Sequence, residues 1–571
     1  MSTPPNTTWT RMTRSLFGCV ALGGIGLWLA QPPVGFALLA WVATIPWIFV
    51  ITEPQLKGRR PYLQIWMALW MYWLASLYFI PIPHPLLWIG WLFLAAYQAV
   101  ILLGFFVISR QAIWRWGLSP LFVVPVVWTS IEWTRAQTEY GFGMISLGHS
   151  QFRWPIAIQL ADIGGSYVVS LMLIGCATGL TIAWRGLRKR GSVESTTLPL
   201  PNRISGLILT AATVAITLGY GYWKLNETSQ PSGPAVRKAL VIQGSIDTVF
   251  PGDRDEAIAF QRNQIEEYRR ITIAARLKVP QADLVLWPEG IFAFPIEYKS
   301  LERAGSGQVP ANEDDLRKAW FYCVQDRADL SDDPTPLPPI ETITGAPVFV
   351  ADGELQYNSV VKLSNFERYD KILRVPFGEF IPVCEWFRSL DELSPIGTGL
   401  TRGHGPMPMK LEAIRDGQLD PRTTVSILPS VCFESTVPQV IRRQLNAVEA
   451  AGQKIDWLAN FTNDGWFYGT SCLDLHLACT VFRSVELRKP FMAVANTGFS
   501  AQIDHLGRIL QQGPRRDEGF LVVDLTQQPQ RWSLYRLTGD LAWMIGAVFS
   551  LIVLISAVRD ARKQRQAEKQ I

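Results

Sequence analysis

Three side chains of this sequence have the types needed for covalent acyl transfer. Glu289 stands in the motif W-P-E-G, Lys371 in D-K-I-L-R-V-P-F-G-E-F, and Cys432 in S-I-L-P-S-V-C-F-E. Each follows an apolar run that is typical of a strand. A thiol attacks acyl carbons well only as a thiolate, so a catalytic cysteine needs a base or a nearby cation. A carboxylate, an amine and a thiol at strand ends therefore predict one acyl-transfer site.

Each of the three groups has a chemical part in this hypothesis. Glu289 ends a buried run, where loss of water would raise its pKa and make it a useful base. Lys371 would stabilise the thiolate and then the tetrahedral oxyanion, together with backbone N–H groups just after Cys432. Taken by type alone, the residues would be a buried thiol and two surface charges. Their joint placement at strand ends favours the catalytic interpretation.

The elements that must position these groups form an α/β pattern. Strands are expected at 238–243, 282–287, 345–350, 358–363, 424–429, 455–461, 491–496 and 519–525. Several of these runs are apolar throughout, which is typical of strands covered on both faces. Helices are expected between them at 254–277, 312–326, 435–451 and 472–488. Interleaved strands and helices predict a layered α/β domain.

Long apolar segments flank this α/β region. The chain has 571 residues, of which 49% are hydrophobic and only 18% charged, which is unusual for a soluble protein of this size. Membrane spans are expected at about 14–30, 34–52, 63–81, 86–108, 119–134, 166–184, 204–223 and 537–558. Most reach the ~20 residues that cross a hydrocarbon core, and the first and fifth are short. The sequence thus predicts a membrane domain of seven spans over 1–225, an outer domain over 226–535, and an eighth span with a basic tail over 536–571.

The basic residues set the orientation of these spans. With an inside N-terminus, one set of short segments holds Arg11, Arg14, Lys57, Arg59, Arg60, Arg110, Arg115, Arg185, Arg188, Lys189, Arg190, Arg203, Arg559, Arg562, Lys563, Arg565 and Lys569. The opposite short loops hold only Arg135 and Arg153. By the positive-inside rule, the α/β domain lies on the outer side. The first apolar run could instead be a cleaved signal peptide, but Q-P-P leads straight into another apolar run, which favours a hairpin of spans.

Several further residues have two interpretations. Cys472, His476 and Cys479 share one face of a predicted helix and could mimic a metal site, but three ligands on one helix without a partner pair favour packing. Glu132 in the fifth span is either an intramembrane functional carboxylate or a partner of Arg135, and both remain open.

The number of cysteines in the outer domain is odd, so at least one thiol is free unless chains cross-link. These cysteines are Cys323, Cys384, Cys432, Cys472 and Cys479. Cys472 and Cys479 would lie about 10.5 Å apart along a helix axis, which is too far for a disulfide. A bond between Cys323 and Cys384 stays possible.

The motifs together resemble the apolipoprotein N-acyltransferases, polytopic membrane proteins with an outer domain of the nitrilase, or carbon–nitrogen hydrolase, superfamily. The Glu, Lys and Cys triad of that superfamily matches Glu289, Lys371 and Cys432. The acyltransferase pattern V-P-F-G-E-F-x-P places an accessory carboxylate at Glu379, and a second follows the nucleophile at Glu434. The segments N-D-G-W-F, H-x-x-x-x-x-x-R-S-V-E-L-R-K-P, L-G-H-S-Q-F and Q-L-A-D-I-G-G-S-Y extend the resemblance over the whole chain.

This resemblance implies a specific fold and activity. The outer domain would be a four-layer αββα nitrilase-like sandwich, inserted between transmembrane helices of an all-α membrane domain of about eight spans. The enzyme would move an acyl chain from a phospholipid, through a Cys432 thioester, to the N-terminal amine of a diacylglyceryl-modified apolipoprotein. It would need no cofactor or metal, bind no nucleic acid, and reside in the bacterial inner membrane with its site on the periplasmic side.

The sequence departs from familiar members at a few places. Phe433 follows the nucleophile where the family often has Tyr, so a hydroxyl beside the substrate is missing. The stretch after Q-G-S-I lacks the P-Q…K-W of familiar members, His149 replaces a common Tyr, and the stretch 301–341 is longer than usual.

Two other functions are compatible with parts of this pattern. A membrane-anchored amidase or nitrilase would use the same triad on a small soluble amide, with water as the acceptor. A transporter or receptor with an outer binding domain would show broken, polar-lined spans in repeated halves. The sequence shows no such repeat, so the acyltransferase is the preferred hypothesis.

Overall fold

The computed structural model describes most of the chain. The described residues are 15–85, 87–137, 141–188, 201–227, 233–249, 252–299, 309–331, 333–350, 354–376, 378–380, 399–415 and 418–570. They form two compact units, a helical unit that ends at Glu227 and resumes at Leu537, and an α/β unit over the residues between. Cys384, and with it the pairing with Cys323, lies outside the described residues.

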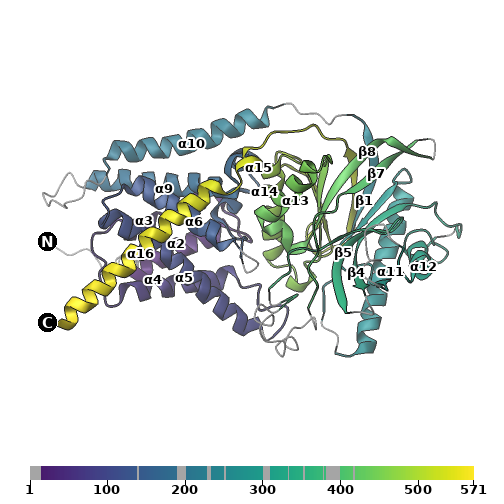
Figure 1. Cartoon of the computed structure of the whole chain (residues 1–571), viewed down its shortest axis with the longest axis horizontal. Coiled ribbons are helices and arrows are strands. Elements are labelled where there is room, and N and C mark those ends of the chain that lie inside the picture. The colour runs from purple at the N-terminus through teal and green to yellow at the C-terminus, as the bar shows by residue number, and fades with distance from the viewer. Residues whose placement is uncertain are drawn as a thin grey trace, which may run out of the picture. The chain divides into compact units, whose positions relative to one another are not determined.

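The first unit consists of helices that pack alongside one another (Figure 1). They are α2 (Leu16–Ala30), η1 (Ala37–Trp41), α3 (Ile45–Ile51), α4 (Pro61–Ser76), α5 (Leu87–Trp114), α6 (Pro120–Arg135), η2 (Leu147–Gln151), α7 (Pro155–Ile158), α8 (Ala161–Gly164), α9 (Ser166–Arg188), α10 (Arg203–Leu225) and α16 (Leu541–Gln570). The C-terminal α16 packs against α5 and α6, so both ends of the chain contribute to this unit.

Four of the described helices are long and apolar enough to cross a membrane, namely α5, α9, α10 and α16. They coincide with four of the eight expected spans. The other four expected spans fall on shorter helices, and their assignment as spans stays a prediction. Two of these are apolar, α2 and η1 with α3, and the other two are α4 and α6. Pro125 lies inside α6, at the span whose limits the sequence defines least well.

Glycines let α9 and α10 approach closely. A Cβ added at Gly206 of α10 would lie 2.6 Å from the carbonyl oxygen of Gly179 and 2.7 Å from the backbone nitrogen of Ala183, both on α9. Small residues bring helix backbones together in membranes, where apolar side chains gain nothing from leaving lipid. Gly206 and Gly179 therefore set the distance between these two helices.

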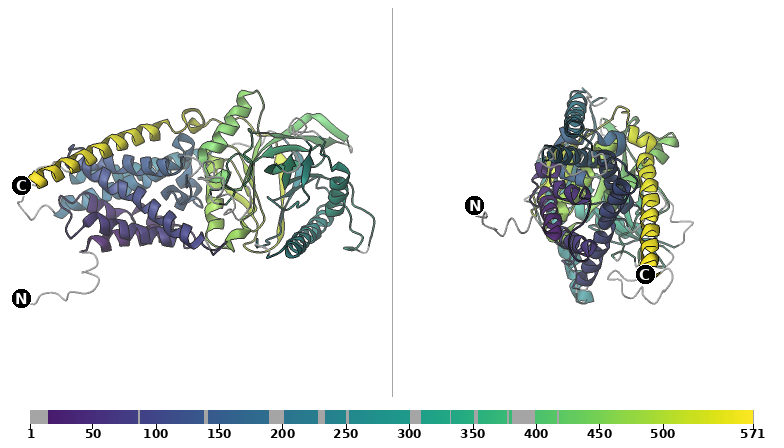
Figure 2. Two further views of the ribbon diagram at one scale, coloured as in Figure 1. Left: turned by 60° about the horizontal axis from the view of Figure 1, so that its bottom comes forward. Right: turned by 90° about the vertical axis from the view of Figure 1, so that its left-hand side faces the viewer.

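The second unit contains two β-sheets with helices (Figures 1 and 2). Its strands are β1 (Ala235–Gln243), β2 (Leu284–Trp287), β3 (Ile296–Tyr298), β4 (Glu341–Val350), β5 (Leu355–Lys362), β6 (Glu367–Asp370), β7 (Met409–Arg415), β8 (Gln418–Val431), β9 (Trp457–Thr462), β10 (Phe491–Ala495), β11 (Ala501–Ile503), β12 (Ile509–Gln512) and β13 (Gly519–Thr526). Its helices are α11 (Arg254–Lys278), α12 (Glu313–Val324), η6 (Cys432–Thr436), α13 (Pro438–Ala450), η7 (Gly465–Phe467), α14 (Cys472–Leu487) and α15 (Leu534–Thr538), the last of which runs into the helical unit.

The two sheets have similar plans. One runs in the order β13-β1-β2-β4-β5-β6 with β3 beside β4, and the other in the order β12-β11-β10-β9-β8-β7. In each sheet three central strands are parallel, β1-β2-β4 and β8-β9-β10, and the flanking pairs are antiparallel apart from β3. The carboxyl ends of parallel strands are where α/β folds place their sites. Glu289 and Cys432 follow β2 and β8 closely.

Apolar side chains cover both faces of the first sheet. Along β1, Ala239 and Val241 enter a core shared with β7, β8, β9 and β10, whereas Leu240 and Ile242 enter a core shared with α11 and α12. The first core therefore lies between the two sheets, and the second lies under a helical layer. This explains why the strand sequences are apolar without alternation.

The structure contains all eight predicted strands and all four predicted helices, with shifted limits. Sequence patterns did not predict β3, β6, β7, β11 and β12. These strands are mostly short, and β6 reads E-R-Y-D, without an apolar run. Its pairing with β5 nevertheless positions Lys371, the next residue.

The close contact of α9 and α10 gives a testable prediction. Gly206→Ala should force the two helices apart and lower the thermal stability of the detergent-solubilised protein by several degrees, because the new Cβ meets backbone atoms. Gly219→Ala on the same helix has nothing within 4 Å of the new Cβ and should leave stability unchanged or raise it. Size-exclusion chromatography after heating measures both. Equal stabilities of the two variants would contradict this packing.

Candidate active site

Glu289 lies at the end of β2 with both carboxylate oxygens occupied. Its Oε1 accepts a hydrogen bond of 2.6 Å from Asn358 Nδ2 on β5, and its Oε2 accepts one of 2.9 Å from the backbone N–H of Asn463 after β9. The residue is 8% exposed. Donors from both sheets thus fix the orientation of this carboxylate.

The backbone around Glu289 needs a glycine on the neighbouring strand. A Cβ added at Gly345 of β4 would lie 2.4 Å from the Cα of Glu289 and 2.8 Å from the carbonyl oxygen of Pro288. Both clashes involve backbone, so a side chain at Gly345 would displace the carboxylate. Gly345 also donates its N–H to the carbonyl of Pro288 at 3.2 Å, which locks this end of β2.

Lys371 contacts two carboxylates. Its Nζ lies 2.6 Å from Glu379 Oε1 and 3.6 Å from Glu289 Oε1, and the side chain is 2% exposed. The second oxygen of Glu379 accepts the backbone N–H of Val375 at 2.8 Å. Buried charges persist when they are paired and their remaining hydrogen-bonding capacity is used. The structure therefore brings three predicted site residues into one charged cluster.

Cys432 lies at the turn between β8 and η6. Its φ is 49°, in the left-handed region that side chains with a Cβ rarely adopt. The turn must be held by its surroundings, and such backbone strain often occurs at functional sites. Cys432 is partly exposed, as is Phe433 beside it.

Glu434 connects the turn of Cys432 to the loop of Lys371. Its Oε1 accepts the backbone N–H groups of Ile372 at 2.7 Å and Leu373 at 3.0 Å, and its Oε2 accepts that of Val431 at 2.7 Å. Tyr369 donates its hydroxyl to both oxygens at 2.8 Å. Because the side chain is fully buried and its oxygens are occupied, Glu434 orders the site from inside and has no oxygen left for a substrate.

The charges shift one another's proton affinities. Burial raises the pKa of Glu289 and Glu379 adds to this, while Lys371 and the hydrogen bonds from Asn358 and Asn463 oppose it, and the net direction is upward. Burial acts to lower the pKa of Lys371, but the carboxylates of Glu379 and Glu289 outweigh it, so the pKa is raised and the amine stays charged.

The thiol is neutral at rest. Burial and the charge of Glu289 raise the pKa of Cys432 well above its ordinary value, against the opposing effect of Lys371. A thiol of this kind must lose its proton to a base during the reaction. The carboxylate of Glu289, with a raised pKa, suits that task better than an ordinary surface Glu.

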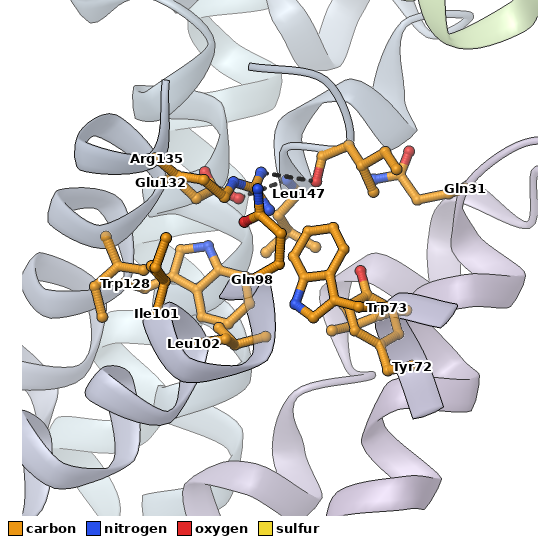
Figure 3. Close-up of a pocket in the computed structure, with 13 residues that line it drawn as sticks. Gln31, Tyr72, Trp73, Gln98, Ile101, Leu102, Trp128, Glu132, Arg135 and Leu147 are labelled. Carbon is orange, nitrogen blue, oxygen red and sulfur yellow. Dashed lines mark hydrogen bonds between the residues drawn. The ribbon is translucent and has the colours of Figure 1, made fainter. Parts of the chain in front are cut away.

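In the helical unit, Glu132 and Arg135 hold one loop. Glu132 Oε1 accepts the backbone N–H of Leu147 at 2.7 Å, and Arg135 donates Nη2 to the carbonyls of Met144 at 3.3 Å and Ile145 at 3.2 Å. They line a small cavity together with Gln31, Tyr72, Trp73, Gln98 and Trp128 (Figure 3). Both charges fix the segment that leads into L-G-H-S-Q-F, and the two interpretations of Glu132 stay open. His149 of that motif is buried.

The cysteines of α14 do not form a metal site within the described part of the chain. No group of three or more His, Cys, Asp or Glu side chains there is arranged to hold an ion. Cys472 and Cys479 are buried in the packing of α14, while His476 contacts the turn of Cys432.

Several residues of the site were not predicted. Asn358 and Asn463 bind Glu289, Tyr369 binds Glu434, and Asp464 binds His476. Asn463 and Asp464 lie in N-D-G-W-F, which the resemblance singled out, so a signal existed. Asn358 and Tyr369 depend on how β5 and β6 pair, which local sequence does not reveal.

Comparisons with known proteins agree with these motifs. Residues 23–179 match the model of the apolipoprotein N-acyltransferase N-terminal domain. A protein of Geobacter metallireducens named apolipoprotein N-acyltransferase is 29% identical over 94% of this chain and 94% of its own length. One of Rhodopirellula baltica with the same name is 26% identical over 94% of this chain and 95% of its own length.

Among solved structures, a CN-hydrolase superfamily protein of Xanthomonas campestris is 16% identical and covers 51% of this chain and 90% of its own length, with a TM-score of 0.29. A TM-score this low supports no argument about the fold. The likeness to known proteins therefore rests on the sequence matches. The predicted resemblance to the apolipoprotein N-acyltransferases is confirmed over nearly the whole chain.

Proposed function

We propose that this chain transfers an acyl chain from a phospholipid to the N-terminal amine of diacylglyceryl-cysteine lipoproteins. The named relatives support this activity. The observation that carries it is the ammonium of Lys371, held between the carboxylates of Glu289 and Glu379 and close enough to Cys432 to act on its thiol electrostatically. That arrangement supplies a nucleophile, a base and a fixed positive charge.

In the first half-reaction, Glu289 removes the proton of Cys432 and the sulfur attacks the ester carbon of the phospholipid. The positive charge of Lys371 stabilises the tetrahedral oxyanion, with backbone N–H groups of the turn as further donors. When the carbon–oxygen bond breaks, the protonated Glu289 returns its proton to the leaving alkoxide. A lysophospholipid departs and an acyl thioester remains on Cys432.

In the second half-reaction, the α-amine of the lipoprotein attacks the thioester. Glu289 takes a proton from the amine, the carbon–sulfur bond breaks, and the proton passes to the sulfur of Cys432. The products are an amide on the lipoprotein and the original enzyme. Such double displacement gives ping-pong kinetics.

The remaining parts of the chain fit this proposal. Both substrates are lipids confined to a membrane surface, so spans in the same chain as the catalytic unit would bring the reactants together. We assign the seven spans of 1–225 and the eighth of 536–571 to the inner membrane, with the α/β unit of 226–535 as a four-layer αββα sandwich on the periplasmic side. Phe433, partly exposed next to the nucleophile, contacts the bound acyl chain.

Acylation of Cys432 is the direct test of this function. After incubation with phosphatidylethanolamine, the intact protein should gain the mass of one acyl chain, and hydroxylamine should remove it because the bond is a thioester. Cys432→Ser should gain no such mass, while Cys479→Ala, which leaves the nucleophile in place, should gain it. Mass spectrometry of the whole protein and of its peptides measures both.

A wild-type protein that stays unmodified but hydrolyses small amides would contradict the proposal and favour a membrane-anchored carbon–nitrogen hydrolase. If Cys432→Ala keeps full function, both the acyltransferase and the carbon–nitrogen hydrolase are excluded. Transfer to water in place of an amine would appear as fatty acid release without lipoprotein acylation.

The pH dependence of acylation tests the part of Glu289. Because the base must be ionised and its pKa is raised, the rate should fall as the pH drops through a value above 4.5, the ordinary pKa of Glu. The hydrogen bond from Asn358 lowers this pKa, so Asn358→Leu should raise it and move the acid limb to higher pH. Gln356→Leu, on the same face of β5, should leave the limb in place. If the acid limb of the pH–rate profile of Asn358→Leu moves to lower pH, Glu289 is not the base.

A further inference from the structure

Three side chains converge on the main-chain carbonyl oxygen of Cys432. His476 Nε2 lies 3.0 Å from this oxygen, Ser435 Oγ donates to it at 3.2 Å, and Asn460 Nδ2 donates to it at 3.2 Å. His476 Nε2 also lies 2.9 Å from Ser435 Oγ, and its Nδ1 lies 2.9 Å from Asp464 Oδ1. The four side chains that make these contacts are buried next to the turn of Cys432.

The chain Ser435–His476–Asp464 has the spacing of a serine hydrolase triad, but its geometry shows a different use. In such a triad the ring nitrogen next to the serine must accept the hydroxyl proton. Here Ser435 already donates its proton to the carbonyl of Cys432. The serine is fully buried as well, so no substrate reaches it.

The partners of His476 determine where its protons are. A carboxylate oxygen only accepts, so the nitrogen facing Asp464 carries a proton. A carbonyl oxygen also only accepts, so the nitrogen 3.0 Å from Cys432 carries one too. A neutral ring would set a lone pair of Nε2 against the carbonyl lone pairs. With both nitrogens protonated, Ser435 Oγ accepts from Nε2 and donates to the carbonyl. Asn460 Nδ2 lies 3.3 Å from Nε2 and directs its own hydrogen bond to the same carbonyl.

The groups around His476 agree with a charged ring. Burial alone would lower its pKa, but the charge and hydrogen bond of Asp464 outweigh this, with smaller contributions from the Cys432 carbonyl and Glu289, and the pKa is raised. The other titratable neighbours are thiols. Burial raises the pKa of both Cys432 and Cys472 well above the ordinary value, so the charge on the ring depends mainly on Asp464.

The carbonyl that these donors hold belongs to the strained residue of the site. Cys432 has a φ of 49°, in the left-handed region that a residue with a Cβ disfavours. Turning Cys432 back into the extended region would rotate its carbonyl away from His476, Ser435 and Asn460. The three bonds therefore oppose relaxation of the turn.

We propose that His476 is a positioning residue whose imidazolium, paired with Asp464, clamps the carbonyl of Cys432 and thereby aims the thiol at the acyl carbon. His476 does not touch the reacting atoms. Its positive charge also favours the thiolate during attack. This proposal rests on the acyl transfer proposed above, because the orientation of the thiol matters only if the thiol is the nucleophile.

The protonation of His476 can be observed without any substrate. The sequence has only five histidines, so a sample with [15N]histidine gives few side-chain signals, and single replacements of the histidines assign them. At neutral pH, His476 should show two nitrogens of similar chemical shift, as an imidazolium does. One protonated and one unprotonated nitrogen would overturn the proposal, whatever the enzyme's activity.

The clamp itself is tested by the reactivity of Cys432. His476→Ala should slow both acylation by phosphatidylethanolamine and alkylation by iodoacetamide, the former by about 100-fold, since a small misplacement of a reacting group costs that much. His476→Gln keeps a donor toward the carbonyl and should recover part of both rates. Cys479→Ala removes a buried side chain of the same helix away from the site and should keep both rates.

These measurements separate the two proposals. If wild-type protein is alkylated at Cys432 but never acylated, the acyl transfer fails while the clamp is still judged by alkylation and by the histidine signals. If His476→Ala and His476→Gln both keep wild-type rates, the clamp is wrong. The rates of each variant are divided by its fraction of folded protein. If the corrected rates of His476→Ala then equal those of Cys479→Ala, the clamp is also wrong.

Discussion

The site depends on one buried ammonium that is shared by two carboxylates. Moving such charges out of water costs several kcal/mol for each ion, and only good geometry and further hydrogen bonds offset this cost. Here all four carboxylate oxygens have a partner. Glu289 is bound by Asn358, Asn463 and Lys371, and Glu379 by Lys371 and the backbone of Val375. The result is a rigid charge pattern in a site that little water enters.

The rest of the α/β unit places this cluster against the nucleophile. Two stacked sheets bring the ends of parallel strands β2 and β8 into one region, and a shared apolar core fixes the sheets relative to each other. Glu434 then joins the loop after β6 to the turn after β8, through bonds to both backbones. The distance between Lys371 and Cys432 is therefore set by a fully buried carboxylate as well as by the sheets.

The sequence could place Glu289 and Cys432 of the proposed site at strand ends because each follows an apolar run within a long motif. Lys371 follows the polar strand β6, so the expectation of an apolar run before it was wrong, and only its motif indicated it. The sequence could not predict the partners of these groups. Asn358 meets Glu289 only because β5 pairs with β4 in a particular register. Tyr369 belongs to the short polar strand β6, and its hydroxyl reaches Glu434. His476 was interpreted as a packing residue, since helical spacing shows which face it shares but not which backbone carbonyl lies opposite. In the helical unit, hydropathy located the long apolar helices, while short helices such as α4 and the proline-containing α6 fall below the length that identifies a span.

The central claim is that the charge of Lys371 makes acylation of Cys432 possible. Replacing Lys371 by Met keeps the approximate length of the side chain but leaves Glu289 and Glu379 facing each other, so one of them takes up a proton. The most direct measurement is the yield of acyl thioester on Cys432 in the folded, monodisperse fraction of Lys371→Met after incubation with phosphatidylethanolamine. We predict that no thioester forms. A thioester that forms at the wild-type rate would contradict this account.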